Sequence, residues 1–208
     1  MQTEFFTECP EQTQSLAGRL AVALPRGGCV ALVGDLGAGK TCFVQGLLEG
    51  LGGDAAMANS PTFVISSEHP CGEQAQLAHI DAYRLSGEDE LASIGWSELV
   101  ADPETWIAVE WADRIAGQLP ASSITVTIEH VGQSQRRIII KWPPAAGALP
   151  DWLQNAASSQ VCVVCGVAID QDSIPFCSDR CKMADLGRWF SGSYTLSRPL
   201  KDVDWEDA

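Results

Sequence analysis

A glycine-rich stretch constrains the fold of this chain more than any other feature of its sequence. Residues 34–41 read G-D-L-G-A-G-K-T and fit the pattern G-x-x-x-x-G-K-[S/T]. The apolar run Cys29–Val33 before it predicts a buried strand, and residues 43–51 after it repeat apolar side chains at helical spacing. A strand, a glycine-rich turn and a helix in this order predict a phosphate-binding loop in an α/β sheet.

Each part of this loop has a chemical task. Its glycines let backbone N–H groups turn toward a phosphate, and the helix that follows presents its positive N-terminus to the same anion. Lys40 supplies a positive charge for the β- and γ-phosphates, and Thr41 can place its hydroxyl on Mg²⁺. The residues expected to contact a nucleotide here are Asp35, Leu36, Gly37, Ala38, Gly39, Lys40 and Thr41.

The first 142 residues alternate between strand and helix patterns. This alternation predicts an α/β domain of the P-loop NTPase kind, with a mainly parallel sheet flanked by helices. The strands are predicted at residues 29–33, 63–65, 77–80, 106–109, 124–128 and 137–141, and the helices at 12–24, 43–51, 88–94 and 112–119.

Acidic and hydroxyl side chains follow the predicted strands and the loop helix. Asp81 and Glu110 each end a strand, where an acid beside a phosphate loop holds Mg²⁺ or orients the attacking water. The pattern does not divide these two roles between them. Ser60 and Thr62 lie between the loop helix and the next predicted strand, where a hydroxyl could meet the γ-phosphate or its metal as switch threonines do, or could serve an ordinary turn. His79 points the same way as Asp81 along its strand, and we expect it to make a structural hydrogen bond.

The loop alone leaves the reaction open. A GTPase would carry N-K-x-D and D-x-x-G motifs, and neither occurs in the sequence. A transport ATPase would carry L-S-G-G-Q, and residues 85–87 match only its start. A small-molecule kinase is one alternative. A binding module whose partner affinity changes with the nucleotide, with negligible turnover, is the alternative outside the enzymes.

Four segments occur together in an order and spacing that resemble one bacterial family. They are the loop, S-P-T-F at 60–63, H-I-D-A-Y-R-L at 79–85 and V-E-W at 109–111. Over residues 8–142 the chain resembles the TsaE family of P-loop ATPases. The resemblance implies ATP hydrolysis that supports threonylcarbamoyladenosine (t6A) synthesis on tRNA. It also implies that TsaB and TsaD are the partners and that tRNA is met only through their complex.

The same resemblance implies roles for individual side chains. One strand-end acid acts in catalysis and the other lies on the metal side, while an aromatic ring forms a wall near the nucleotide. The implied roles are catalysis for Lys40, Asp81 and the switch residue Thr62, Mg²⁺ binding for Thr41 and Glu110, and the wall for Trp111.

Four cysteines near the C-terminus have the spacing of a metal site. Cys162 and Cys165 form one close pair, and Cys177 and Cys181 form a second. Eleven residues separate the two pairs. Four thiolates suit tetrahedral Zn²⁺ in a closed structural site, and so short a segment needs such a staple to fold. Cysteines without metal, disulfides and an iron–sulfur cluster are the alternatives.

The residues around these cysteines resemble a second family. C-V-V-C-G at 162–166 and P-F-C-S-D-R-C-K-M-A-D-L-G-R-W at 175–189 resemble the YacG zinc-binding family, which implies inhibition of DNA gyrase through its B subunit. Pro143, Pro144 and Pro150 mark a linker before this module. The expected division is a TsaE-like ATPase domain at 1–142, a linker at 143–160, and a small zinc module with an acidic tail at 161–208.

Composition excludes several other classes. The 13 Lys and Arg against 27 Asp and Glu give a formal net charge of −14, which argues against direct, tight binding to a nucleic-acid backbone. No apolar run approaches the roughly 18–20 residues that a membrane span needs. The first residues also lack the basic and apolar regions of a signal peptide. We therefore expect a cytoplasmic protein without membrane contact.

Overall fold

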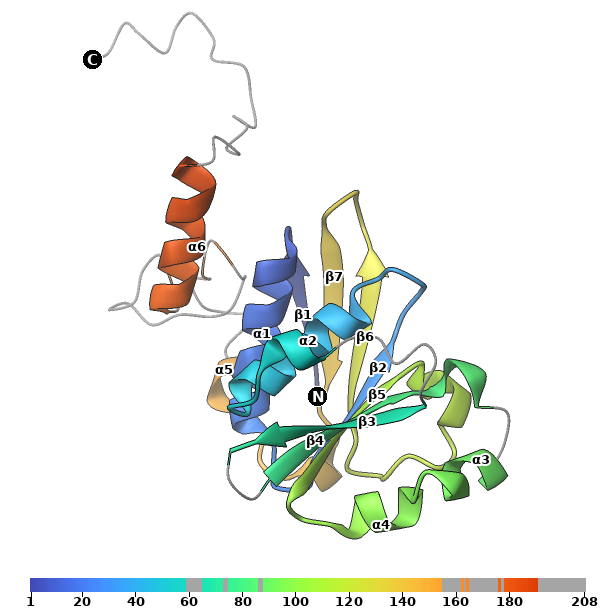
Figure 1. The fold of residues 1–208 in the computed structure, drawn as a ribbon. Coiled ribbons are helices and arrows are strands. Elements are labelled where there is room, and N and C mark those ends of the chain that lie inside the picture. The colour runs from blue at the N-terminus through green and yellow to red at the C-terminus, as the bar shows by residue number, and fades with distance from the viewer. Residues whose placement is uncertain are drawn as a thin grey trace, which may run out of the picture.

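A single sheet organises most of the chain in this computed structural model, which describes residues 1–58, 65–72, 75–85, 88–154, 162, 164, 176 and 178–190. Within that part, seven strands pair in the order β1-β7-β6-β2-β5-β4-β3 (Figure 1). The strands are β1 (Gln2–Thr7), β2 (Cys29–Val33), β3 (Ser66–Cys71), β4 (Ala75–Asp81), β5 (Thr105–Glu110), β6 (Ile124–His130) and β7 (Arg136–Lys141).

The sheet is parallel in its centre and antiparallel at both edges. β2 lies between β5 and β6 and runs parallel to both, and β4 runs parallel to β5. β3 and β7 are joined to β4 and β6 by short connections, which can only produce antiparallel pairs. β1 adds to β7, also antiparallel. The predicted parallel sheet is thus confirmed for the four central strands, whereas the edges make the whole sheet mixed.

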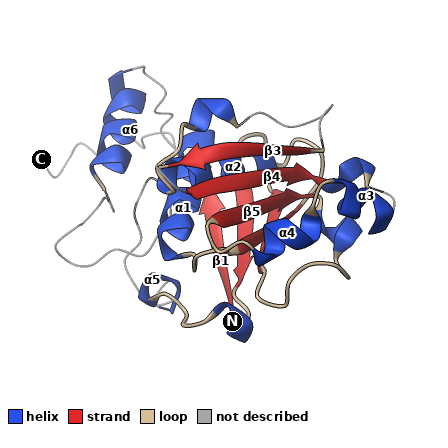
Figure 2. Ribbon diagram, turned by 60° about the horizontal axis from the view of Figure 1, so that its bottom comes forward, coloured by secondary structure: helices blue, strands red, loops and turns tan. Residues whose placement is uncertain are grey.

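Helices cover both faces of the sheet (Figure 2). Val30 and Leu32 of β2 face the layer of α1 and α2, and Cys29 and Ala31 face the layer of α3, α4 and η3. Because both faces are covered, the strand is apolar throughout. The α-helices are α1 (Pro10–Ala23), α2 (Lys40–Gly50), α3 (Glu88–Ser93), α4 (Trp96–Ala101), α5 (Asp151–Gln154) and α6 (Asp179–Phe190), and the 3₁₀ helices are η1 (Ala55–Met57), η2 (Ala82–Arg84), η3 (Ala112–Ile115) and η4 (Pro144–Ala146).

Several elements differ from those predicted. The helix predicted at 112–119 is wrong in type and length, because only a 3₁₀ turn forms, over Ala112–Ile115. Of the strand predicted at 63–65, residues 63 and 64 lie outside the described residues, and β3 begins just after it. β1, β3 and α4 were not predicted, since their sequences lack a clear apolar period.

Helices α1 and α2 pack with their backbones in contact. A Cβ atom on Gly46 of α2 would lie 2.3 Å from the carbonyl oxygen of Gln14, and one on Gly50 would lie 2.5 Å from that of Gly18. Larger side chains at these positions would force the helices apart. The two helices therefore form a close pair, which we call the α1–α2 platform.

The stretch predicted as a linker begins with ordered structure. Leu153 of α5 is buried, and its carbonyl oxygen accepts a hydrogen bond from Thr3 Oγ1 at 3.2 Å. The Trp152 and Phe5 rings lie 5.9 Å apart between centroids. Residues 143–154 thus pack against β1, and the domain boundaries themselves stay a prediction.

Among the helices that the structure describes, none combines the length and the apolar character needed to cross a membrane.

We predict that Gly46→Ala lowers the free energy of unfolding by about 1–3 kcal/mol, because the new methyl group overlaps backbone atoms of α1. Chemical denaturation measures this change. Gly187→Ala in α6 is the matched control, since nothing lies within 4 Å of its Cβ position. Equal stability of Gly46→Ala and the wild type would contradict the backbone contact.

Candidate nucleotide-binding site

The glycine-rich loop leaves β2 and enters α2 through backbone conformations that favour glycine. Gly34 has a φ of 153°, and a Cβ atom there would lie 2.3 Å from the carbonyl oxygen of Ile128. Gly37 and Gly39 have φ values of 75° and 110°. Side chains at these positions would strain the turn, so the loop keeps its backbone open to an anion.

Lys40 is the first residue of α2, and its ammonium group folds over the loop. Its Nζ donates to the carbonyl oxygens of Gly34 at 2.7 Å and Asp35 at 2.9 Å. The side chain is buried, and burial lowers the pKa of Lys40 while the carboxylates of Glu110 and Asp81 act in the opposite direction. A compact positive charge is therefore held where the sequence pattern expects phosphates.

Glu110 connects the loop helix to two neighbouring strands. Its Oε1 accepts a hydrogen bond from Thr41 Oγ1 and another from His79 Nε2, both at 2.8 Å. Glu110 and His79 are buried, and because a carboxylate only accepts, the proton lies on Nε2 of His79. The structural hydrogen bond expected of His79 is confirmed. A hydroxyl beside an acid at a strand end is a donor set that suits Mg²⁺.

Asp81 lies beside Glu110 at the end of the neighbouring strand. The two residues are direct partners in the parallel register of β4 and β5. Asp81 is largely buried, and its Oδ1 accepts a hydrogen bond from the Tyr83 backbone N–H at 2.9 Å, which caps η2. This bond fixes the carboxylate at the rim of the site. The structure therefore brings together the two acids that the sequence placed on separate strands.

Trp111 covers the ammonium group of Lys40. Its ring centroid lies 3.6 Å from Lys40 Nζ and 4.9 Å from the Tyr83 ring centroid. Trp111 also has a φ of 57°, the one positive φ of a non-glycine residue in the described part of the chain. Such strained backbone is retained where the surroundings impose it and is common at functional sites.

One residue of the site region escaped the sequence analysis. Arg136, at the start of β7, donates from Nε to the carbonyl oxygen of Ala38 at 2.8 Å. It supports the loop from a position 98 residues away in the sequence, so no local pattern indicates it. Thr62, the predicted switch residue, lies outside the described residues.

The cysteines of the second module are described in part. Cys162 and Cys181 are buried in the same apolar cluster as α1 and α2, while Cys165 and Cys177 lie outside the described residues. Among the described side chains, no three His, Cys, Asp or Glu residues come together as a metal site would require. The burial of Cys162 and Cys181 in one apolar cluster is compatible with a shared zinc ion. The site with four cysteine ligands stays a prediction.

The fold and the loop define the class of this chain: an α/β protein with a P-loop between a central parallel strand and its following helix. Residues 7–138 match the family model of the threonylcarbamoyl adenosine biosynthesis protein TsaE, and the chain belongs to the TsaE family. Residues 161–207 match the model of the DNA gyrase inhibitor YacG, so a YacG domain follows at the C-terminus.

Individual relatives agree with this assignment. The tRNA threonylcarbamoyladenosine biosynthesis protein TsaE of Bacillus subtilis is 39% identical over 137 residues, which cover 66% of this chain and 84% of that protein. The protein of the same name from Streptomyces coelicolor is 42% identical over 118 residues, covering 56% and 78%. The crystal structure of Bacillus subtilis YdiB matches with a TM-score of 0.55 and 32% identity, over 69% of this chain and 86% of YdiB.

We predict that Gly34→Ala weakens binding of a magnesium–nucleotide complex and lowers stability more than Gly52→Ala does. Both glycines have positive φ, at 153° and 86°, but only the new methyl group at position 34 overlaps a backbone atom. Titration calorimetry and denaturant unfolding measure the two effects. Equal losses in both variants would mean that backbone strain alone, and not the contact with Ile128, decides the outcome.

Proposed function

We propose that this chain is the ATP-hydrolysing component of the bacterial t6A modification machinery and works with TsaB and TsaD. The observation that carries the proposal is the hydrogen bond from Thr41 to Glu110, beside the ammonium group of Lys40. This arrangement places a hydroxyl, an acid and a cation at one end of the P-loop. These groups could bind Mg²⁺ beside the nucleotide phosphates, as ATP hydrolysis requires.

ATP and Mg²⁺ suit the residues present. The loop backbone and Lys40 would hold the phosphates, while Thr41 and Glu110 would hold Mg²⁺ directly or through water. Bound Mg²⁺ neutralises the charge that develops on the phosphates during transfer. The Trp111 ring lies over the Lys40 ammonium group and limits water access to it, and the Tyr83 ring packs against Trp111.

Asp81 is the proposed catalytic acid, and Glu110 the metal-side residue. Two contacts support this division. Glu110 Oε1 accepts a hydrogen bond from Thr41, the hydroxyl proposed to bind Mg²⁺, whereas the Asp81 carboxylate accepts one from the Tyr83 backbone N–H and none from Thr41. We therefore propose that Asp81 orients the attacking water. Thr62 is proposed to complete the site as its switch residue.

Two alternatives give different results in solution. A small-molecule kinase would transfer the γ-phosphoryl group to an alcohol or nucleoside rather than to water. A nucleotide-switched binding module would change its affinity for partners with negligible turnover even in the complex. The acidic net charge of −14 favours contact with tRNA through partners rather than directly, and t6A synthesis places the proposed work in the cytoplasm.

The YacG domain is proposed to bind one Zn²⁺ through Cys162, Cys165, Cys177 and Cys181 and to bind the B subunit of DNA gyrase. The four-thiolate spacing and the match of residues 161–207 support zinc. The match to a family described as gyrase inhibitors supports gyrase as the target.

We predict slow, Mg²⁺-dependent ATP hydrolysis that TsaB and TsaD accelerate. Lys40→Ala lowers turnover at least about 100-fold because the phosphate charge loses its partner. Asp81→Asn lowers turnover about 10²–10⁴-fold while nucleotide binding persists. Glu110→Gln raises the Mg²⁺ concentration needed for half-maximal binding.

Phosphate release and nucleotide titrations with the purified complex measure these effects, and Arg26→Glu, far from the loop in a surface ion pair, is the control. Unchanged turnover in Lys40→Ala would overturn the assignment. Phosphate transfer to an added alcohol or nucleoside would favour the kinase alternative.

We predict one zinc per chain in freshly purified, reduced protein, and a loss of that zinc in Cys177→Ser. Cys9→Ser, outside the four-cysteine set, should retain the metal. Metal analysis by mass spectrometry measures the content, and visible absorption detects an iron–sulfur cluster. Protein that contains neither metal would contradict the site.

A further inference from the structure

Helix α6, which belongs to the YacG domain, lies beside α1 in the structure (Figure 1). Cys181 of α6 is 1% exposed, and its Sγ lies 3.4 Å from Ser15 Oγ of α1. Ala184, one turn further along, is half-buried against the same apolar cluster. Met183 between them is 65% exposed. One face of α6 is therefore directed at the ATPase domain and the opposite face at solvent.

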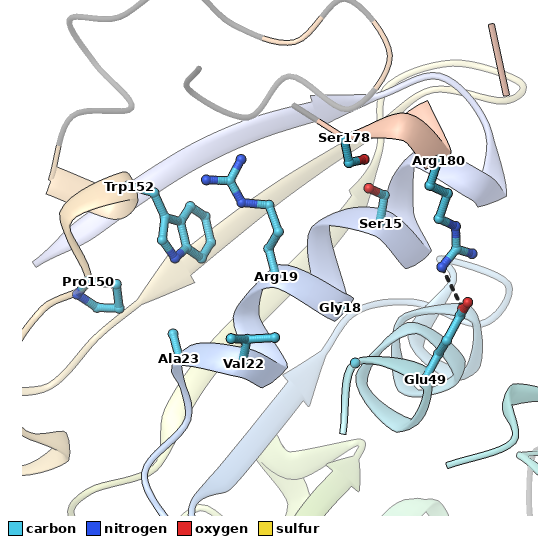
Figure 3. A pocket seen from close by; sticks show the side chains of 11 residues that line it. Ser15, Gly18, Arg19, Val22, Ala23, Glu49, Pro150, Trp152, Ser178 and Arg180 are labelled. Carbon is cyan, nitrogen blue, oxygen red and sulfur yellow. Dashed lines mark ion pairs between the residues drawn. The ribbon is translucent and has the colours of Figure 1, made fainter. Parts of the chain in front are cut away.

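An ion pair extends this contact to α2. Arg180 Nη1 lies 2.6 Å from Glu49 Oε2 (Figure 3). Glu49 lies in the last turn of α2, where a negative charge is unfavourable, and α2 has no basic residue of its own in that turn. Arg180 supplies the missing positive charge from the other domain. Both side chains are partly exposed, so this pair contributes little by itself and the buried contacts at Cys181 and Ala184 must supplement it.

The contact leaves an open groove of about 550 Å³ between the two domains. One wall carries Arg19 of α1, whose guanidinium group lies 4.9 Å from the Trp152 ring centroid, and the other carries Ser178 and Arg180 (Figure 3). Among the described residues of α6, Arg180 lines this groove, next to Ser178 just before the helix. Relative motion is the general expectation for two domains of one chain unless their interface is large and hydrophobic.

Part of the surface that α6 contacts belongs to α2, the helix that begins at the phosphate loop. α2 begins with Lys40 and Thr41 and ends next to Glu49, so α6 touches the far end of the same 11-residue helix. α1, which carries Ser15, is held to α2 through Gly46 and Gly50. A displacement of the α1–α2 platform would therefore move the helix that carries Lys40 and Thr41.

We propose that the C-terminal domain is a built-in regulator of the nucleotide site. Its helix α6 docks reversibly on the α1–α2 platform, and the docked state holds α2 and the phosphate loop in their binding geometry. The docking itself stands on the contacts of Arg180, Cys181 and Ala184. Its effect on nucleotide affinity rests on the proposed function.

A pair of substitutions on α6 tests the docking in the full-length protein. Ala184→Arg places a charged side chain in the contact, whereas Met183→Arg places the same side chain on the solvent face of the same helix. Hydrogen exchange followed by mass spectrometry reports on α1 and α2. We expect exchange there to be about tenfold faster in Ala184→Arg, and unchanged in Met183→Arg. Equal exchange in the two variants would overturn the proposal.

A charge exchange tests the docking without burying a new group. Arg180→Glu should speed exchange in α2, and adding Glu49→Arg should restore it, because the ion pair re-forms with reversed signs. Arg26→Glu, which breaks the Arg26–Glu104 pair within the ATPase domain, should leave α2 unaffected. If the double variant exchanges as fast as Arg180→Glu, the pair does not hold α6 in place and the proposal fails.

The regulatory effect is measured with a non-hydrolysable ATP analogue and Mg²⁺. We expect its Kd to be about fivefold higher in Ala184→Arg than in the wild type or Met183→Arg. An unchanged Kd together with faster exchange would overturn regulation. Absence of binding to the wild type would instead contradict the proposed ATPase function, and the exchange data would still decide whether α6 docks.

Discussion

The carboxylate of Glu110 holds together the elements from which the site is built. It accepts hydrogen bonds from Thr41 of the loop helix and from His79 of the neighbouring strand. The bond from His79 is buried and the bond from Thr41 is partly buried, so an unpaired donor there is costly and each partner fixes the position of the others. The order β6-β2-β5-β4 places the end of β2 next to the end of β5, and the loop therefore leaves the sheet directly beside this acid.

The sequence predicts this part of the molecule well because its determinants are local. The strand Cys29–Val33 has the bounds that its apolar run indicates, and the glycines of the loop occupy positive φ as the motif requires. Asp81 and Glu110, each recognised only as a strand-end acid, become direct neighbours once their strands run parallel. The family resemblances found in residues 8–142 and 160–208 likewise agree with the two matching family models.

Other features depend on contacts that no local pattern contains. The bond from Arg136 to Ala38 joins residues 98 positions apart, and the edge strand β3 is too polar to show an apolar alternation. The short helix after Trp111 stops at Ile115 although its sequence suits a longer one, because tertiary context decides the length of weak helices. In the sequence, the close approach of α1 and α2 shows only as glycines within predicted helices. Glycine lowers the stability of a helix, and the contact between the two backbones explains why it stands there.

The pairing of β1 with β7 brings the two ends of the TsaE domain together. The terminal amino group of Met1 donates to the carbonyl oxygen of Trp142 at 2.9 Å. Because β7 runs opposite to β6, this junction lies at the edge of the sheet away from the phosphate loop. The two ends of the domain therefore meet at a place remote from the phosphate loop. A second domain can be attached there without passing over the site. Joining the two ends and opening the chain in another loop would give a circular permutant with the same sheet.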